Sequence, residues 1–269
     1  MTAIQLGFLG AGNMAEAIAR GILRAEVLAP NAILAADPDA QRRDLFQQQL
    51  GIAAHAENRP VVEAAPVVLV AVKPQQFDAA LAALGSAFGP EKLVISICAG
   101  LSTHHVEEVL AAGTRVVRAM PNTPMLVGRG MAGICAGSHA TPDDLATAER
   151  LLGAAAEVIR VTEDLMDAVT AVSGSGPAYF FYLVELLSAA AVEMGLSEDD
   201  ARRLARVTFE GAAKLLASSG EDAADLRRKV TSPGGTTEAA IRTFDGLGLK
   251  QTVLQAVKAA RDRGRELGR

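Results

Sequence analysis

Hydrophobic and polar residues follow two different patterns along the chain, and the change falls near residue 162. Before that point, short β-branched runs alternate with longer amphipathic stretches, which is typical of alternating strands and helices. Strands are predicted at Ile4–Leu9, Ile33–Ala36, Val67–Val72, Leu93–Ile97, Arg115–Met120, Met131–Cys135 and Val158–Val161. Helices are predicted between most of them, at Asn13–Arg24, Pro38–Leu50, Phe77–Leu84, Thr103–Leu110 and Pro142–Ala156. This alternation favours βαβ units, and therefore a mostly parallel sheet covered by helices.

After residue 162 the pattern is helical. Helices are predicted at Leu165–Val172, Pro177–Met194, Glu198–Ser218, Ala223–Val230, Glu238–Phe244 and Leu249–Leu267. The stretch Pro177–Met194 is apolar on nearly every side apart from Glu185 and Glu193, so we expect it to be buried on more than one side. A helical domain of roughly 100 residues offers too little cover for it, so we expect a homodimer formed through this helix. The predicted domains are residues 1–162, an α/β domain, and residues 163–269, an all-α domain.

Composition and charge narrow the classes of function. The 269 residues carry a net charge of −5, which disfavours nucleic acid as a partner because phosphate binding needs a basic surface. Cys98 and Cys135 are too few for a disulfide scaffold, and the first residues show no signal-peptide pattern, so we expect a cytoplasmic protein. The charges inside Pro177–Met194 favour a buried helix over a membrane span. No metal is expected.

The first predicted turn carries the strongest chemical signal. Gly10-Ala11-Gly12-Asn13-Met14-Ala15 follows a strand, opens a helix and has the G-x-G-x-x-A form of a dinucleotide-binding fingerprint. Gly10 allows the tight turn, Gly12 lets the backbone approach a pyrophosphate, and free N–H groups at the helix start favour that anion. Asp37 ends the second strand, where it would meet the adenosine ribose. These features predict a Rossmann-type doubly wound sheet; the alternative is a glycine-rich turn without a ligand.

Later strand ends add small and polar residues at the edge where ligands bind in such sheets. One strand runs into Ala71-Val72-Lys73-Pro74, the next into Cys98-Ala99-Gly100, and a third ends at Met120 and Asn122. Each segment alone reads as an ordinary loop. The three together, in a chain that also has the fingerprint, indicate a trough for the cofactor.

Two glycine-rich segments stand out in the helical half. Thr231-Ser232-Pro233-Gly234-Gly235-Thr236-Thr237 exposes consecutive N–H groups and hydroxyls before a helix, which suits a carboxylate ligand. The alternative is a helix–helix turn with Thr236 or Thr237 as the N-cap. Ser173-Gly174-Ser175-Gly176-Pro177 precedes the long apolar helix, and here the favoured interpretation is a tight connector with Pro177 in the first helical turn.

These segments together resemble the pyrroline-5-carboxylate reductase family across essentially the whole chain. The segments that carry the resemblance are Gly7–Met14, Ala71–Pro74, Arg118–Pro124, Ser173–Tyr179 and Val230–Thr237. The last is the most discriminating, because many dehydrogenases share the first. The resemblance implies a Rossmann domain followed by a helical dimerisation domain, with dimers often built into larger rings.

The resemblance also implies the residues of the site. Cofactor contacts are expected at Leu9, Gly10, Ala11, Gly12, Asn13, Met14, Asp37, Asn58, Ala71, Val72, Lys73, Pro74, Cys98, Ala99 and Gly100, to which the strand-end argument adds Met120 and Asn122. The substrate carboxylate is expected on Ser232, Gly234, Gly235, Thr236 and Thr237, with Glu163 nearby. Thr237 is the expected catalytic residue, its hydroxyl near the ring nitrogen.

The implied reaction is reduction of the cyclic imine 1-pyrroline-5-carboxylate to L-proline by NAD(P)H. At Asp37 the chain departs from many family members, which have a small hydroxyl residue suited to a 2′-phosphate. Arg42 and Arg43 follow on the next helix and could clamp that phosphate, or they could be solvated surface charges. Both NADP and NAD are therefore expected as cofactors.

Two other functions remain open at this point. One is a dehydrogenase of a small hydroxy acid or sugar acid, which would need a Lys or His base in the helical half, where Lys214 and Lys229 are the candidates before the last helix. The other is a non-catalytic NAD(P)-sensing module, which has no use for a carboxylate site at Ser232–Thr237.

Overall fold

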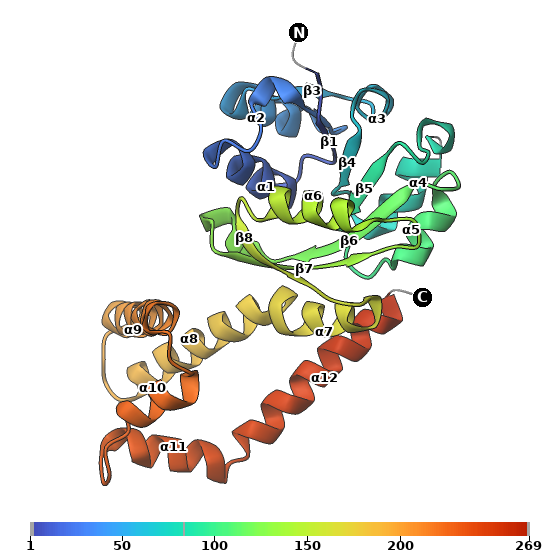
Figure 1. Ribbon diagram of the computed structural model, residues 1–269. Helices are drawn as coiled ribbons and strands as arrows, with labels where there is room; N and C mark the ends of the chain where they lie inside the picture. Colours follow the sequence, from blue (N-terminus) through green and yellow to red (C-terminus); the bar gives the residue numbers. More distant parts are fainter. Residues whose placement is uncertain (1–2, 83, 268–269) are drawn as a thin grey trace. The chain divides into compact units, whose positions relative to one another are not determined.

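The computed structural model describes residues 3–82 and 84–267, and these form two compact units. The first unit comprises Met1–Ser175 together with Ala260–Arg269, and the second comprises Gly176–Ala259. The predicted division fell at residue 162, before a short helical stretch that packs with the sheet. Figure 1 shows the elements of each unit.

The first unit is built on an eight-stranded sheet in the order β3-β2-β1-β4-β5-β6-β7-β8. The strands are β1 (Leu6–Leu9), β2 (Ile33–Ala36), β3 (Ala53–His55), β4 (Val67–Val70), β5 (Leu93–Ser96), β6 (Arg115–Pro121), β7 (Gly130–Ala136) and β8 (Ala156–Arg160). All neighbouring pairs are parallel except β6 and β7, which are antiparallel. The prediction of a mostly parallel, Rossmann-type sheet is confirmed.

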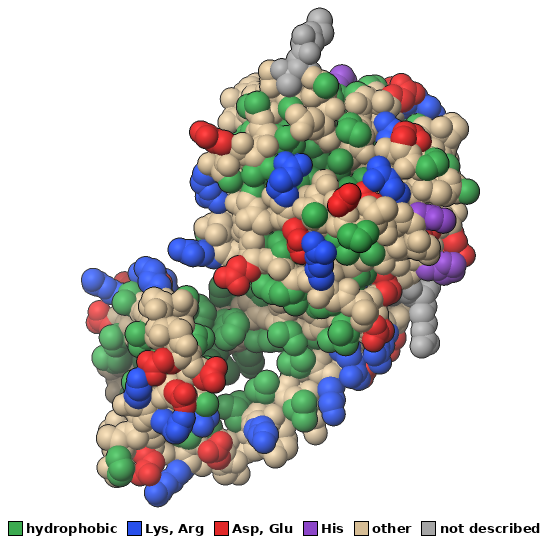
Figure 2. All heavy atoms as spheres, in the orientation of Figure 1, with side chains coloured by type: hydrophobic (Ala, Val, Ile, Leu, Met, Phe, Trp, Pro, Cys, Tyr) green, Lys and Arg blue, Asp and Glu red, His purple; other side chains and the backbone are tan. Residues whose placement is uncertain are grey.

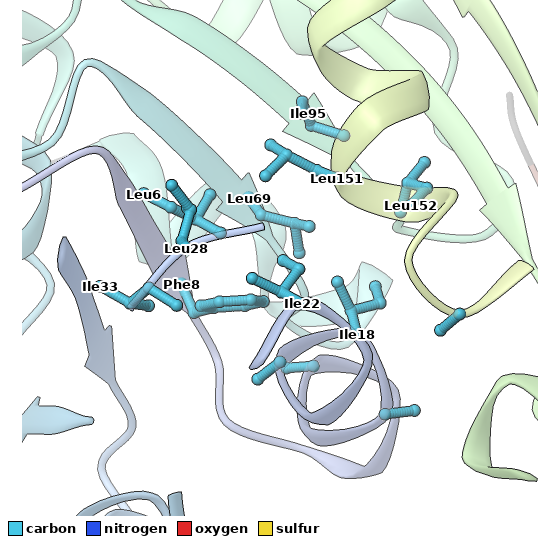
Figure 3. Packing of buried hydrophobic residues seen from close by; sticks show 14 of the residues in the cluster. Leu6, Phe8, Ile18, Ile22, Leu28, Ile33, Leu69, Ile95, Leu151 and Leu152 are labelled. Atoms are coloured by element: carbon cyan, nitrogen blue, oxygen red, sulfur yellow. The ribbon is translucent and has the colours of Figure 1, made fainter. Parts of the chain in front are cut away.

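Helices cover both faces of the sheet (Figure 1). They are α1 (Asn13–Arg24), α2 (Ala40–Leu50), α3 (Arg59–Ala64), α4 (Phe77–Ala82), α5 (Thr103–Val109), α6 (Pro142–Leu152) and α7 (Met166–Val169). Successive strand residues point to opposite faces, so each buried strand supplies two cores. Leu6, Phe8 and Leu69 pack with α1 and α6, as the close-up in Figure 3 shows, whereas Leu9 and Val70 belong to the cluster on the other face.

The seven predicted strands all form, with bounds within two residues of the prediction. Strand β3 and helix α3 were not predicted, because a three-residue Ala-Ala-His strand and a six-residue helix are too short to show a period. The predicted helix Pro142–Ala156 ends at Leu152, since Ala156 already begins β8. Ala83, inside the predicted helix Phe77–Leu84, lies outside the described residues.

The predicted helix Leu165–Val172 is broken into three kinds of helical turn. A 3₁₀ turn (Glu163–Leu165) leads into α7, and a π-helical turn (Thr170–Gly174) follows it. The prediction of a single α-helix was wrong, because the spacing of apolar residues does not distinguish the backbone hydrogen-bonding patterns of 3₁₀, α and π turns.

A buried lysine side chain, that of Lys92, caps the C-terminal end of α3. Lys92, just before β5, is 9% exposed, and its Nζ donates to the backbone oxygens of Val62 at 2.8 Å, Ala65 at 2.9 Å and Glu63 at 3.3 Å. The last carbonyls of a helix have no partner within it. Lys92 therefore closes the C-terminal end of α3 with its charge.

The second unit is helical. It holds α8 (Gly176–Glu193), α9 (Glu198–Ser219), α10 (Ala223–Lys229), α11 (Thr236–Gly246) and the first part of α12 (Leu249–Leu267), whose last turns belong to the first unit. Its surface exposes many large apolar side chains (Figure 2), among them Phe180, Phe181, Tyr182, Leu183, Leu186 and Leu187 on α8.

The stretch Glu163–Glu193 is long and apolar enough to cross a membrane by length and composition alone. Only 6% of its most apolar window is buried in the single chain. A helix that forms a subunit interface is also apolar and exposed when one chain is viewed without its partner, so the exposure of this stretch fits such an interface as well as a membrane span.

Candidate active site

The turn after β1 has the geometry that a pyrophosphate site requires. Gly10 has φ +92°, and a Cβ there would lie 2.8 Å from the carbonyl oxygen of Ala71, so only glycine fits between the ends of β1 and β4. A Cβ on Gly12 would instead point into open space. Gly12 is the N-cap of α1, and no side chain caps the helix. The N–H groups of the first turn are therefore available to an anion.

Asp37 lies at the end of β2 and is bonded to this turn. Its carboxylate accepts hydrogen bonds from the backbone N–H of Ala11 at 2.7 Å and of Asp39 at 2.9 Å. Asp37 thus joins the end of β2 to this turn, on the side where a Rossmann sheet places the adenosine ribose.

Two arginines of α2 surround the same place. Arg42 Nε donates to the carbonyl of Ala11 at 2.5 Å, and its Nη2 pairs with Glu16 at 2.8 Å. Arg43 donates to the carbonyls of Asp37 at 2.9 Å and Pro38 at 2.8 Å. The sequence suggested these residues as a pair without separating them; the structure assigns Arg42 to the glycine-rich turn and Arg43 to the end of β2.

The segments that follow β4 and β5 offer backbone groups and one charged side chain, that of Lys73, to a ligand. Lys73, after β4, is exposed, and within the described residues its Nζ has no bonded partner. Cys98, after β5, is buried, its thiol lying 3.2 Å from the carbonyl oxygen of Val72, and burial raises its pKa to about 11. Cys98 can therefore meet a cofactor only through its backbone, while Ala99 beside it is exposed. Asn58 sits before α3, and its amide reaches the carbonyl of Ala80 at 3.5 Å.

The end of β6 is held by its own amide side chain. Asn122 is 8% exposed; its Nδ2 donates to the carbonyl of Ser173 at 3.1 Å, and its Oδ1 accepts from the N–H of Met131 at 2.9 Å. The side chain of Asn122 thus joins three segments of the fold. Met120 remains partly exposed at the same strand end.

Glu163 occupies a charged cluster in the first unit. Its carboxylate pairs with Arg118 and accepts from the N–H of Thr103 at 3.3 Å and the thiol of Cys135 at 3.2 Å. Burial opposes ionisation, but the Arg118 charge and these hydrogen bonds outweigh it, so the pKa of Glu163 lies below its ordinary value. Burial and the Glu163 charge together raise the pKa of Cys135 to about 12.

A cavity of about 300 Å³ lies beside this cluster. It is lined by Gly100, Ser102, Arg118, Glu163, Asp164, Asp167, Gly264 and Arg265. Gly100, with φ +82°, lies within the loop between β5 and α5, beside Leu267 in the final turn of α12. Across the described residues no group of three or more His, Cys, Asp or Glu is arranged to hold a metal ion.

The loop 231–237 lies in the second unit, between α10 and α11. Gly235, not Thr236 or Thr237, is the N-cap of α11, and it makes no side-chain capping bond, so the alternative of a threonine cap is wrong. The N–H of Gly234 donates to the carboxylate of Glu238 at 2.8 Å. This loop therefore already binds one carboxylate oxygen through its backbone, and Gly234, at φ +72°, has open space around its Cα.

Comparison with known proteins places this geometry in a family. A family model described as pyrroline-5-carboxylate reductase dimerisation matches residues 163–267. The pyrroline-5-carboxylate reductase of Synechocystis is 42% identical over 267 residues, which cover 99% of each chain. The chain belongs to the pyrroline-5-carboxylate reductase family. It is an oxidoreductase, and the match to the dimerisation model indicates a homo-oligomer.

Further comparisons agree with this family and with the fold. A model described as NADP oxidoreductase coenzyme F420-dependent matches residues 5–100, which contain the fingerprint and Asp37. The reductase of Coxiella burnetii has a TM-score of 0.92 at 36% identity, covering all of both chains. The Plasmodium falciparum enzyme, solved with NADP bound, has a TM-score of 0.87 at 29% identity, again over both whole chains.

Proposed function

We propose that this protein reduces 1-pyrroline-5-carboxylate to L-proline with NADPH or NADH. Family membership over the full chain supports the reaction. The observation that carries the substrate assignment is the loop 231–237, where a backbone N–H already holds the Glu238 carboxylate. A hydroxy-acid dehydrogenase would need a base, and Lys214 and Lys229 are both ion-paired, to Glu210 and Glu221. An NAD(P)-sensing module would not need this loop.

The dinucleotide, when bound, supplies a hydride to the imine carbon. The N–H groups from Gly12 to Met14 would hold its pyrophosphate, and the Asp37 carboxylate would accept hydrogen bonds from the adenosine ribose. Ala71–Pro74, Cys98–Gly100 and the end of β6 line the rest of the trough, with Asn58 beside it. Orientation and electrostatics are therefore the protein's contribution.

On the substrate side, Ser232, Gly234, Gly235, Thr236 and Thr237 receive the carboxylate. Within the described part of the chain the hydroxyl of Thr237 has no hydrogen-bond partner, so it is free to bond the ring nitrogen. An iminium that is already protonated in solution needs no strong acid, and a hydroxyl suffices. Glu163 contributes a fixed charge, because Arg118 holds its carboxylate.

The assembly and location belong to the same proposal. The exposed apolar side chains of α8 pair across a dimer, and such dimers build a larger ring. The enzyme works in the cytoplasm. Sedimentation at low micromolar concentration should show no stable 27.9 kDa monomer; a stable monomer would overturn the dimer.

The function is tested by following loss of NAD(P)H absorbance with pyrroline-5-carboxylate and, in parallel, gain of NAD(P)H absorbance with NAD(P)+ and a panel of hydroxy acids. We expect turnover with the imine alone. Activity confined to a hydroxy acid would replace this proposal with the dehydrogenase, and cofactor binding without turnover of any substrate would replace it with the sensing module.

A further inference from the structure

The predicted connector Ser173–Pro177 is partly helical: Ser173 and Gly174 belong to a helical turn that follows α7, whereas Pro177 lies in the first turn of α8, as predicted. Residues Thr170–Gly174 form a π-helical turn, closed by the N–H of Ser175 donating to the carbonyl of Thr170 at 2.8 Å. Such turns are rare and occur frequently at functional sites, because they leave backbone and side chains in unusual positions. The turn lies entirely within the first unit.

This turn is fixed to the end of β6. Asn122 donates to the carbonyl of Ser173 at 3.1 Å, and a Cβ on Gly174 would lie 2.6 Å from Cε of Met120. The turn therefore lies directly against the end of the Met120 side chain. Ser173 is held against the strand end that supplies Met120 and Asn122 to the cofactor trough.

The hydroxyl of Ser173 is buried and has no hydrogen-bond partner in the described structure. The nearby Thr170 hydroxyl, by contrast, donates to the carbonyl of Met166 at 2.9 Å. A buried polar group without a partner costs free energy, so such groups in native proteins call for an explanation. A ligand group that arrives at the end of β6 would provide one.

The strand order identifies which part of the ligand arrives there. The glycine-rich turn after β1 receives the pyrophosphate, and Asp37 after β2 faces the adenosine half. The other half of the dinucleotide must then extend to the opposite side of β1, over the ends of β4, β5 and β6. The end of β6 is thus on the nicotinamide side of the trough.

We propose that the Ser173 hydroxyl hydrogen-bonds the carboxamide of the nicotinamide ring. This inference rests on the proposed function. A serine hydroxyl offers one donor and two acceptor positions, and a primary carboxamide offers both as well, so the two are complementary. Through this bond the π-helical turn would set the orientation of the ring at the strand ends.

The test compares Ser173→Ala with Ser175→Ala. The second change removes a hydroxyl of the same kind, two residues further along the chain. Binding is measured with two probes on the full-length protein: NADPH, by its fluorescence, and 2′-phospho-ADP-ribose, which lacks the ring, by calorimetry. Ser173→Ala should weaken NADPH about threefold to tenfold, the effect of one neutral hydrogen bond. It should leave 2′-phospho-ADP-ribose unchanged within twofold, and Ser175→Ala should leave both unchanged.

Thermal unfolding separates this role from a structural one. Because the hydroxyl has no partner in the free protein, Ser173→Ala should keep or raise the Tm without ligand and reduce the Tm increase produced by NADPH. If Ser173→Ala does not fold, Ser173→Cys, of similar size and weaker hydrogen bonding, takes the same measurements. An unchanged NADPH Kd, or an equal loss with both probes, would overturn the inference. A wild-type protein that binds neither NADPH nor NADH would instead overturn the proposed function.

Discussion

The carboxylate of Asp37 accepts a hydrogen bond from the backbone N–H of Ala11 at 2.7 Å, joining the end of β2 to the glycine-rich turn after β1. The residue that faces the adenosine ribose in our proposal is therefore also part of the frame of the pyrophosphate site. A substitution there changes cofactor choice and turn geometry at once.

Asp37→Ser should favour NADPH. A carboxylate repels a 2′-phosphate, and at ~5 Å with an effective dielectric of about 20 one charge pair costs roughly 3 kcal/mol before screening by solvent and salt. We expect the kcat/KM ratio of NADPH to NADH to rise at least fivefold in steady-state kinetics at fixed ionic strength. A ratio unchanged within twofold would place Asp37 away from the ribose.

Arg42→Ala combined with Arg43→Ala should have the opposite effect. Both guanidinium groups lie beside Asp37 or the glycine-rich turn, so their removal takes positive charge from the 2′-phosphate. The NADPH to NADH ratio should fall several-fold. Arg160→Ala is the control, because Arg160 pairs with Glu149 at the β8 edge, the far end of the sheet from β2. Equal effects of the two changes would indicate a general loss of charge.

Thr237→Ala should lower kcat/KM for the imine by about tenfold to a hundredfold or somewhat more, the loss of one hydrogen bond to a charged group at roughly 1.5–3 kcal/mol. The Kd for NADPH should barely change, because Thr237 is assigned to the substrate. Thr237→Ser keeps the hydroxyl and should restore most of the activity. Wild-type kcat/KM in a folded Thr237→Ala dimer would remove Thr237 from the catalytic step.

Glu163→Gln should make stability less dependent on pH. The pKa of Glu163 is lowered in the folded protein, so its ionised form stabilises the fold above the ordinary glutamate pKa of about 4.3, and this contribution is lost as the pH falls through the lower folded value. In urea unfolding the variant should be less stable than wild type at pH 7, with the difference shrinking below about pH 4.3. A difference independent of pH would contradict this.

Lys92→Met should reduce the free energy of unfolding by about 2–3 kcal/mol, because it leaves the carbonyls of Val62, Glu63 and Ala65 without their shared donor. Lys214→Met is the matched control: its pair with Glu210 is exposed, so its loss should change the free energy of unfolding far less. Urea unfolding at one protein concentration measures both. Equal losses of unfolding free energy in the two variants would mean that the buried hydrogen bonds of Lys92 stabilise the fold no more than an exposed ion pair does.

Much of the fold could be predicted from local patterns. The apolar runs of the strands and the glycine-rich turn at Gly10–Met14 are patterns of residues adjacent in the sequence. The strand bounds predicted from them agree with the structure to within two residues. The π-helical turn after Val169 could not be predicted in this way, because one of its carbonyls, that of Ser173, is bonded by Asn122, 51 residues earlier in the chain. Short elements such as the strand Ala53–His55 contain too few residues to show a hydrophobic periodicity.

The candidate site shows the same limit. Motifs identified which loops face a ligand, but not what their side chains already bond. The pairing of Arg118 with Glu163 and the bond from Arg42 to Ala11 join residues far apart in the chain, so spacing could not reveal them. Cys98 was predicted as a cofactor contact, and the sequence did not reveal that its thiol is buried against the carbonyl of Val72, which leaves only the backbone for such a contact.

The chain leaves the first unit after Ser175 and returns at Ala260, so in topological terms the helical unit is an insertion rather than an appendage. A fragment ending at residue 162 would lose Met166, which is fully buried, and the end of α12, whose Leu267 lies against Gly100. Its sheet would then lack cover near the β5 loop. The nucleotide-binding unit is therefore completed by residues 260–267, which follow the helical unit in the sequence, so during synthesis it can finish folding only after the helical unit has been made.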